Sequence, residues 1–259
     1  MMPSTLRALI FDVDGTLADT ERDGHRIAFN RAFADAGLPW HWDVAGYGEL
    51  LAVTGGRERL LHFMDAHVPQ MAQAEREMLA RRLHQRKTDH YLHLVEHGAI
   101  AWRPGVLRLI AQAREAGVAL AIATTTTRAN VLALLKHAGD ACPAEAFAVL
   151  GAAEDSERKK PDPGIYFHVL DRLGLAPGQC IAVEDSQAGL QASRATGIAT
   201  VVTVNDYTRL QDFAGALSVV SDLGEPTVPA RHLQGLALRG ACVDLAQLRV
   251  WLHDRDEAA

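Results

Sequence analysis

The stretch LRALIFDVDGT, residues 6–16, carries the clearest signal of fold class in the chain. Residues 6–13 are mostly apolar, and the run gives way to Asp-Gly-Thr at residues 14–16. A strand buried on both faces of a parallel sheet has this pattern, because polar residues begin only where the chain leaves the sheet for a loop. The stretch therefore predicts a buried strand that ends near Asp12.

Beyond this strand the sequence takes on helical periodicity. Between Thr20 and Gly98, apolar residues recur three or four positions apart, as Phe29 and Phe33 do. That spacing places them on one face of a helix. Almost no strand-like run interrupts the segment, so residues 20–98 are predicted to form an inserted all-helical cap domain of four or five helices.

From residue 99 onward, helices alternate with apolar strands. Helices are predicted over 105–116, 128–138, 162–173 and 187–196, and strands over 119–125, 146–151, 180–186 and 199–204. This alternation is typical of a parallel sheet with helices on both faces. The predicted fold class is α/β, a doubly wound (Rossmann-like) parallel sheet core with an inserted all-helical cap.

The domain prediction assigns residues 1–19 and 99–225 to the core and 226–259 to a C-terminal extension. We expect this extension to pack on the core or to be partly frayed. One helix is predicted over Val243–His253, and the charged end, residues 254–259, is expected to fray.

Composition excludes several classes of protein. The chain has 259 residues, 48% of them hydrophobic, and a formal net charge of -6, which argues against a nucleic-acid or anionic-membrane partner. The three cysteines, Cys142, Cys180 and Cys242, are far apart and form no CxxC pair. They predict reduced thiols and a cytoplasmic protein. We expect a monomer or a weak homo-oligomer.

Polar residues gather where the predicted strands end. Asp12 and Asp14 end the first strand, Thr124 follows the second, and Glu184 and Asp185 end the strand near Val183. The carboxyl ends of parallel strands are where such sheets bind ligands. Carboxylates gathered without an arginine partner repel each other unless a hard divalent cation lies between them, so Mg²⁺ is the predicted cofactor.

Phosphoryl transfer needs a nucleophile, an acid for the leaving group and cations on the phosphoryl oxygens. Asp12 is the candidate nucleophile that forms an aspartyl phosphate, and Asp14 the candidate acid and base. Thr124 and Lys160 are candidates to hold the phosphoryl oxygens. The predicted metal ligands are Asp12, the backbone carbonyl of Asp14, and Asp185, with Glu184 in support.

Four segments in this order resemble the motifs of the haloacid dehalogenase (HAD) superfamily. They are FDVDGT at residue 11, the strand that ends in Thr124, KPDPGIY from Lys160 and VEDS from Val183. A DxDGT motif followed by a helical insertion is similar to the subgroup that includes β-phosphoglucomutase and phosphoglycolate phosphatases. The resemblance implies a magnesium-dependent phosphatase.

Longer matches resemble the CbbY-type sugar phosphatases found with carbon-fixation genes. These matches are FDVDGTLADTE, WHWD near Trp42, LLAVTGGRER, IAWRPGV and ATTTTRANV. The implied reaction converts xylulose 1,5-bisphosphate to xylulose 5-phosphate. Two departures from that pattern are an extra residue between Glu21 and His25 and a longer C-terminal tail.

The TGGRER segment of the cap, residues 54–59, opens a helix after a glycine turn. Its backbone N–H groups, with Arg57 or Arg59, would bind an anion. The resemblance implies that this loop closes over the substrate and that Glu21 contacts sugar hydroxyls. The candidate substrate-binding residues are Glu21, Gly55, Gly56, Arg57, Glu58, Arg59, Thr125 and Thr126.

Other interpretations of these residues remain open. Thr125 and Thr127 fit a strand end and a helix cap as well as they fit substrate binding. Arg57, Arg59 and Arg103 would also suit structural ion pairs. Lys159 is expected at the surface, and His90, His93 and His97 are expected to form a solvated helix face.

Three other functions also remain open. A β-phosphoglucomutase-like phosphomutase would share every core residue, and a phosphoglycolate phosphatase would differ in substrate. A non-enzymatic receiver-like domain is a more distant alternative.

Overall fold

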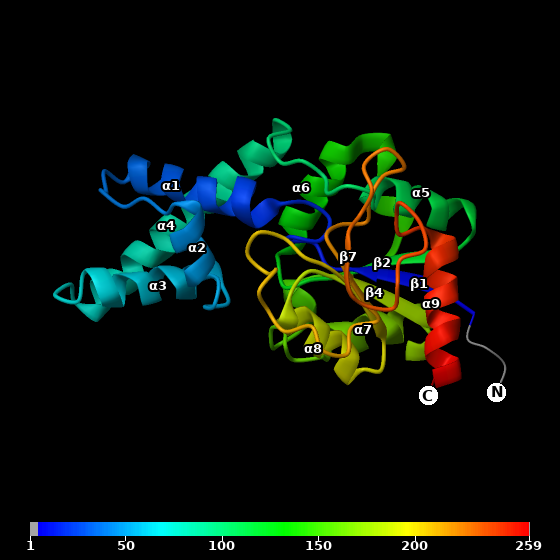
Figure 1. Ribbon diagram of the computed structural model, residues 1–259. Helices are drawn as coiled ribbons and strands as arrows, with labels where there is room; N and C mark the ends of the chain where they lie inside the picture. Colours follow the sequence, from blue (N-terminus) through cyan, green and yellow to red (C-terminus); the bar gives the residue numbers. More distant parts are fainter. Residues whose placement is uncertain (1–4, 259) are drawn as a thin grey trace. The chain divides into compact units, whose positions relative to one another are not determined.

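The computed structural model describes residues 5–258 and divides the chain into two compact units (Figure 1). One unit, here the sheet unit, contains the chain up to Asp19 and from Ala101 onward; the other, the helical unit, is Thr20–Ile100. Within the described residues, no helix has the length and apolar character that crossing a membrane requires.

A seven-stranded sheet forms the centre of the sheet unit, in the order β3-β2-β1-β4-β5-β6-β7. Neighbouring strands are parallel except β7, which is antiparallel to β6. The strands are β1 Ala8–Phe11, β2 Ala119–Ala123, β3 Phe147–Gly151, β4 Cys180–Glu184, β5 Ala199–Thr203, β6 Ser218–Val220 and β7 His232–Gly235. The predicted fold class is confirmed.

Strand β1 lies inside the sheet, between β2 and β4, and all of its residues are buried. This position explains the apolar run at residues 6–13, because both faces of the strand are covered. Phe11 lies opposite Ile122 of β2 and Val183 of β4. The three strands therefore end at nearly the same level.

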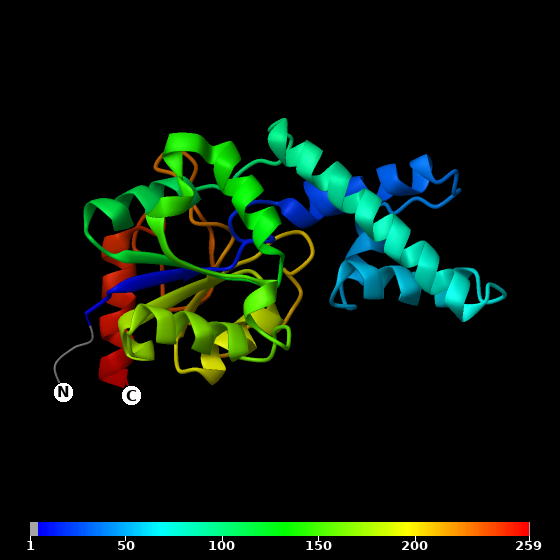
Figure 2. The same ribbon diagram turned by 180° about the vertical axis from the view of Figure 1, so that it is seen from behind.

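Helices cover both faces of the sheet, α5 and α6 on one side and α7 and α8 on the other (Figures 1 and 2). They are α5 Val106–Glu115, α6 Arg128–Ala138, α7 Gly164–Leu173 and α8 Gln187–Ala195. Each begins and ends within about two residues of its predicted bounds. On the α7 face, Ile10, Ala182 and Val169 belong to one buried apolar cluster.

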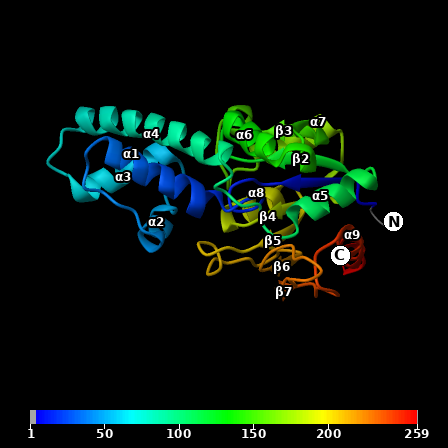
Figure 3. The same ribbon diagram turned by 90° about the horizontal axis from the view of Figure 1, so that it is seen from above.

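The C-terminal part of the chain adds two strands and a helix that the sequence pattern did not fully indicate. Strands β6 and β7 lie at one edge of the sheet (Figure 3) and were not predicted. They have 3 and 4 residues, and every residue of β7 is exposed, so neither shows a long apolar run.

Helix α9 spans Leu245–Ala258, so the predicted helix began two residues too early and ended too soon. The fraying expected from residue 254 is not observed over the described residues. Trp251 is buried and donates its indole N–H to the carbonyl oxygen of Ala237 at 3.0 Å. An ion pair of 3.2 Å joins Asp254 to Arg239, so packing and charge both hold the helix.

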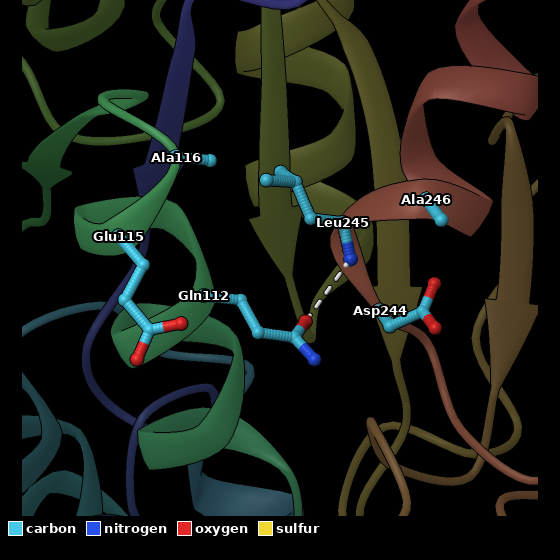
Figure 4. A pocket seen from close by; sticks show the side chains of 6 residues that line it. All are labelled: Gln112, Glu115, Ala116, Asp244, Leu245 and Ala246. Carbon is cyan, nitrogen blue, oxygen red and sulfur yellow. Dashed lines mark hydrogen bonds between the residues drawn. The ribbon is translucent and has the colours of Figure 1, made fainter.

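The N-terminus of α9 is tied to α5. The backbone N–H of Leu245 donates to Oε1 of Gln112 at 3.2 Å (Figure 4). A surface pocket of about 340 Å³ lies between these two helices, with Glu115 and Asp244 among its lining residues. None of the candidate site residues lines this pocket.

The helical unit contains α1 Arg26–Asp35, α2 Val44–Leu50, α3 Gly56–His67 and α4 Gln73–Glu96. Helix α1 packs along α4. An aromatic cluster that includes Phe29, Phe33 and Trp42 lies in the interior of the helical unit. A π-helical segment, Thr20–His25, precedes α1. A π-helical turn contains one residue more than an α-helical turn. The segment Thr20–His25 spans the position of the extra residue between Glu21 and His25.

Candidate active site

Three carboxylates meet at the carboxyl ends of β1 and β4. Asp12 directly follows β1, Glu184 is the last residue of β4, and Asp185 follows it. The parallel register places Asp12 beside Glu184, and the backbone N–H of Asp12 donates to Val183 O at 3.0 Å. Each carboxylate offers one oxygen, and these oxygens all lie within 4.8 Å of one another.

Lys160 supplies the ammonium group of this cluster. Its Nζ donates to Asp12 Oδ1 at 2.7 Å, to Glu184 Oε1 at 2.6 Å and to the carbonyl oxygen of Ala123 at 2.8 Å. An ammonium group has three hydrogens, so all of them meet protein oxygens. Lys160 therefore orients Asp12 and Glu184, and a direct contact with a phosphoryl oxygen stays a proposal.

Glu184 is completely buried. Its Oε1 accepts hydrogen bonds from both Lys160 and the hydroxyl of Tyr166. Among the described residues, Glu184 Oε2 has no hydrogen-bond partner. Gly189 of α8 makes room for the carboxylate, because a Cβ atom at that position would overlap it.

Burial dominates the ionisation of the carboxylates. It raises the pKa of Asp12 to about 7; Lys160 opposes this rise, while Glu184 and Asp14 reinforce it. Burial also raises the pKa of Asp185 well above its ordinary value, helped by Asp12 and Glu184. For Lys160, burial lowers the pKa, but Asp12 and Glu184 outweigh it and raise that pKa above normal.

The cluster therefore holds three buried carboxylates against one ammonium group. Oxygen ligands of this kind are those that hard divalent cations prefer, and a cation would offset the burial and the mutual repulsion that raise the pKa values of Asp12 and Asp185. The donor set thus fits Mg²⁺. The predicted residues Asp12, Asp185 and Glu184 are brought together as a possible metal site.

Thr124 follows β2 and is buried, and its backbone N–H donates to Gly151 O at 3.0 Å. Its hydroxyl oxygen accepts from the N–H of Thr126 at 3.3 Å, which leaves its own hydrogen able to donate. Thr126 Oγ1 accepts from the side chain of Asn130 at 3.1 Å, and Thr127 is the N-cap of α6. The capping interpretation of Thr127 is therefore the observed one.

Asp14 lies two residues beyond Asp12 in a half-buried position and forms a backbone bridge with Ala18. Gly15 follows with φ of 81°, a left-handed conformation that favours glycine. Asp14 lies close enough to Asp12 to help raise the pKa of the Asp12 carboxyl.

In the helical unit, Glu21 and Arg59 meet through Tyr47. The hydroxyl of Tyr47 donates to Glu21 Oε2 at 2.5 Å and accepts from Arg59 Nη1 at 2.7 Å. Arg59 is buried and also donates to Leu50 O at 3.1 Å. Arg59 thus has a structural role in this unit, and Tyr47 is a partner that the sequence did not indicate.

The TGGRER segment begins α3. Gly55 is its N-cap with φ of 104°, and a Cβ atom on Gly56 would lie 2.9 Å from the His84 ring. Arg57 and Glu58 are exposed and form an ion pair of 3.5 Å. Of the two arginines, Arg57 is the exposed one, and a role for it in substrate binding stays a proposal.

Near the carboxylates, the structure shows contacts for three residues to which the sequence patterns had assigned no role in the site. Tyr166 belongs to the KPDPGIY segment, so its position in that motif was an available signal. Asn205 follows β5, where strand-end polar residues gather. Arg103, for which a surface position or a structural ion pair was one open interpretation, is buried and donates to backbone carbonyls.

Comparison with known proteins identifies the family. A family model described as haloacid dehalogenase-like hydrolase matches residues 6–197, which is more than half of the chain. The chain belongs to this family. The predicted superfamily and its hydrolase class are confirmed, and HAD hydrolases generally use Mg²⁺.

Relatives of known name are similar over most of the chain. The plasmid-borne CbbY protein of Cupriavidus necator is 49% identical over 250 residues, which cover 96% of this chain and 97% of that protein. CbbY of Rhodobacter capsulatus is 43% identical and covers 87% of this chain and 97% of its own length. The predicted resemblance to CbbY-type proteins is confirmed.

A solved structure is also similar. The crystal structure of a CbbY mutant from Rhodobacter sphaeroides in complex with xylulose-(1,5)bisphosphate matches with a TM-score of 0.73 and 40% identity. The match covers 84% of this chain and 95% of that chain.

Proposed function

We propose that this HAD-family hydrolase is a Mg²⁺-dependent sugar-phosphate phosphatase that converts xylulose 1,5-bisphosphate to xylulose 5-phosphate. The observation that carries the proposal is the contact of Lys160 with Asp12 and Glu184 beside Asp185 at the strand ends. The similarity to a CbbY protein in complex with xylulose-(1,5)bisphosphate supports the substrate.

In the first half-reaction, a carboxylate oxygen of Asp12 attacks phosphorus. A bond forms between Asp12 and the phosphoryl group, and the ester bond to the sugar oxygen breaks. Asp14 gives its proton to the leaving oxygen. Lys160 favours this step because its hydrogen bond to Oδ1 orients Asp12 and leaves Oδ2 as the attacking oxygen.

In the second half-reaction, water releases the phosphate. The carboxylate of Asp14 takes a proton from water, whose oxygen attacks phosphorus, and the bond to Asp12 breaks. The hydroxyl of Thr124 donates to a phosphoryl oxygen in both half-reactions. Its hydrogen is able to do so because the bond from the Thr126 N–H engages only the hydroxyl oxygen. Both carboxylates return to their starting protonation states.

Mg²⁺ would be held by Asp12, the backbone carbonyl of Asp14, and Asp185, with Glu184 in support. When bound, it would supply positive charge to the transferring phosphoryl group. Glu184 would act through Lys160 and Tyr166, since both bind its Oε1.

A bisphosphate needs a second anion site, and we place it at the start of α3. The free backbone N–H groups of a helix N-terminus bind anions, and Gly55 and Gly56 allow close approach there. Exposed Arg57 would add charge there. Within the sheet unit, Thr125 and Thr126 are separate candidates for substrate contact. Glu58 would set the position of Arg57 through their ion pair, and Glu21 would accept from sugar hydroxyls.

The phosphomutase alternative shares the core residues, and the phosphoglycolate phosphatase alternative shares the whole reaction class. CbbY relatives at 40% identity or more favour the bisphosphate phosphatase over both.

The proposal includes a cytoplasmic location, supported by three cysteines without disulfides, and a monomer or weak homo-oligomer.

The test compares kcat/KM for xylulose 1,5-bisphosphate, 2-phosphoglycolate and an aryl phosphate, with Mg²⁺ and with EDTA. We expect a preference for the bisphosphate that disappears in EDTA. Asp12→Asn should abolish turnover while the circular dichroism spectrum stays unchanged. A preference for 2-phosphoglycolate would refute the substrate, and glucose 6-phosphate formed from β-glucose 1-phosphate with its bisphosphate cofactor would favour the mutase.

The second anion site has its own test. Arg57→Gln should raise KM for the bisphosphate several-fold more than KM for the aryl phosphate, since only the bisphosphate carries a second phosphate. Arg81→Gln, an exposed arginine of α4, serves as the matched control. Equal effects of the two variants would remove Arg57 from the proposal.

A further inference from the structure

Asn205 lies directly beside Asp185, in the loop that follows β5. Its Nδ2 donates to Asp185 Oδ2 at 2.6 Å. The two oxygens of a carboxylate belong to one rigid planar group, so a bond that fixes Oδ2 also fixes the direction of Oδ1. The side chain of Asn205 thereby orients the carboxylate of Asp185.

The amide orientation of Asn205 is set by its own loop. Its Oδ1 accepts the backbone N–H of Tyr207 at 2.9 Å, so Nδ2 must be the atom that faces Asp185. The backbone N–H of Asn205 donates to Thr208 Oγ1 at 3.0 Å. The bond from Tyr207 therefore fixes the side-chain amide with its donor toward Asp185, whereas the bond to Thr208 involves only the backbone of the turn.

Arg103 fixes the backbone on both sides of this contact. Its Nη2 donates to Val204 O at 2.6 Å, next to Asn205, and to Ser221 O at 2.9 Å. Its Nη1 donates to the carbonyl oxygen of Gly15, in the loop that carries Asp14. One buried guanidinium thus joins the loops after β1, β5 and β6.

Gly15 allows the close approach. A Cβ atom on Gly15 would lie 2.5 Å from Asp185 Oδ2 and 2.7 Å from Asn205 Nδ2. The absence of a side chain at this position is therefore what lets the carboxylate and the amide lie against the backbone of the Asp14 loop.

We infer that Asn205 is a positioning residue that sets the Mg²⁺ affinity of the site by holding Asp185 in its ligating orientation. The inference rests on the proposed magnesium site. Partners that orient a metal ligand in this way are typically worth 10- to 100-fold in metal affinity.

The test measures Mg²⁺ binding to the full chain by calorimetry, with no substrate present. Asn205→Ala removes the donor, and we expect its Mg²⁺ Kd to rise about 10- to 100-fold. Asn205→Asp retains the acceptor for the Tyr207 N–H but sets a carboxylate against Asp185. We expect this variant to unfold at a lower temperature in EDTA and to be stabilised by Mg²⁺ more than the wild type is.

Thr208→Val is the matched control, since it removes the other bond of the turn without touching Asp185. Its Mg²⁺ Kd should stay within about twofold of the wild-type value. An unchanged Kd in Asn205→Ala, or wild-type behaviour of Asn205→Asp in both measurements, would show that Asn205 serves only the turn and would overturn the inference.

The wild type and Asp185→Asn separate this inference from the proposed function. Suppose that the wild type binds Mg²⁺, that Asp185→Asn abolishes this binding and that Asn205→Ala leaves it unchanged. That result would overturn the role of Asn205 alone. A wild type that binds no Mg²⁺ would overturn both.

Discussion

Replacing Lys160 by methionine removes the ammonium group from the buried cluster while keeping a side chain of similar length. In the wild type, Nζ lies 2.7 Å from an oxygen of Asp12 and 2.6 Å from one of Glu184. Removing one partner of a buried ion pair costs about 3–5 kcal/mol, because the remaining charge is left uncompensated. Two carboxylates lose their partner here, so we expect Lys160→Met to cost about 5 kcal/mol in the absence of metal.

The assay is calorimetric unfolding at pH 8, once in EDTA and once in excess Mg²⁺. A loss of about 5 kcal/mol corresponds to a fall of about 10–20 °C in the unfolding temperature of a unit of this size. In Mg²⁺ the loss should shrink, because a bound cation offsets the same carboxylates.

Lys159→Met is the matched control, since Lys159 is the exposed neighbour in the chain. Its unfolding temperature should match that of the wild type in both solutions. If Lys160→Met unfolded in EDTA within about 1 kcal/mol of the wild type, the reasoning on buried-charge balance would be wrong.

Three further predictions concern the same cluster. Gly189→Ala should destabilise the protein by about 1–3 kcal/mol and lower kcat, since its Cβ would overlap the Glu184 carboxylate. Gly240→Ala should do neither, because a Cβ added there would meet no atom beyond its chain neighbours within 4 Å, and equal urea midpoints for the two variants would refute the overlap. Tyr166→Phe removes the hydroxyl that donates to Glu184 and should cost about 1.5–3 kcal/mol in urea unfolding, and a smaller loss than about 0.5 kcal/mol would contradict that bond. Burial raises the pKa of Asp12 from an ordinary 3.8 to about 7, so the folded protein binds a proton at Asp12 more tightly than the unfolded chain does. The contribution of Asp12 to the free energy of unfolding therefore falls as pH rises from about 4 to about 7. Asp12→Asn, which does not titrate, should therefore gain stability relative to the wild type between about pH 4 and pH 7 in EDTA, and a constant difference would contradict the shift.

Strand β1 and the helices around the sheet were predictable because their signals are local. An apolar run such as that of β1 requires burial on both faces, and helical periodicity requires only one buried face. Strands β6 and β7 gave no such signal. They are short, and β7 is exposed, so only its pairing with β6 makes it a strand.

The arginines show the limit of prediction from residue type. Arg59 was a candidate anion ligand, yet it is buried against Tyr47 and Leu50, whereas Arg57 is exposed. A structural ion pair was one open interpretation of Arg103, and its hydrogen bonds go to backbone carbonyls from three loops. A guanidinium finds its acceptors among segments distant in the chain, and sequence spacing carries no record of them.

The amino-acid sequence was sufficient to predict that FDVDGT ends a buried strand and that Asp12, Glu184 and Asp185 lie at one edge of a parallel sheet. These inferences hold because strand ends and motif positions are properties of short segments. The side-chain partners, in contrast, depend on the tertiary fold: Lys160 donates to both Asp12 and Glu184, and Asn205 donates to Asp185. A hydrogen bond requires its donor and acceptor to lie about 2.7–3.2 Å apart. Side chains that are far apart in the chain reach such distances only after the sheet has formed.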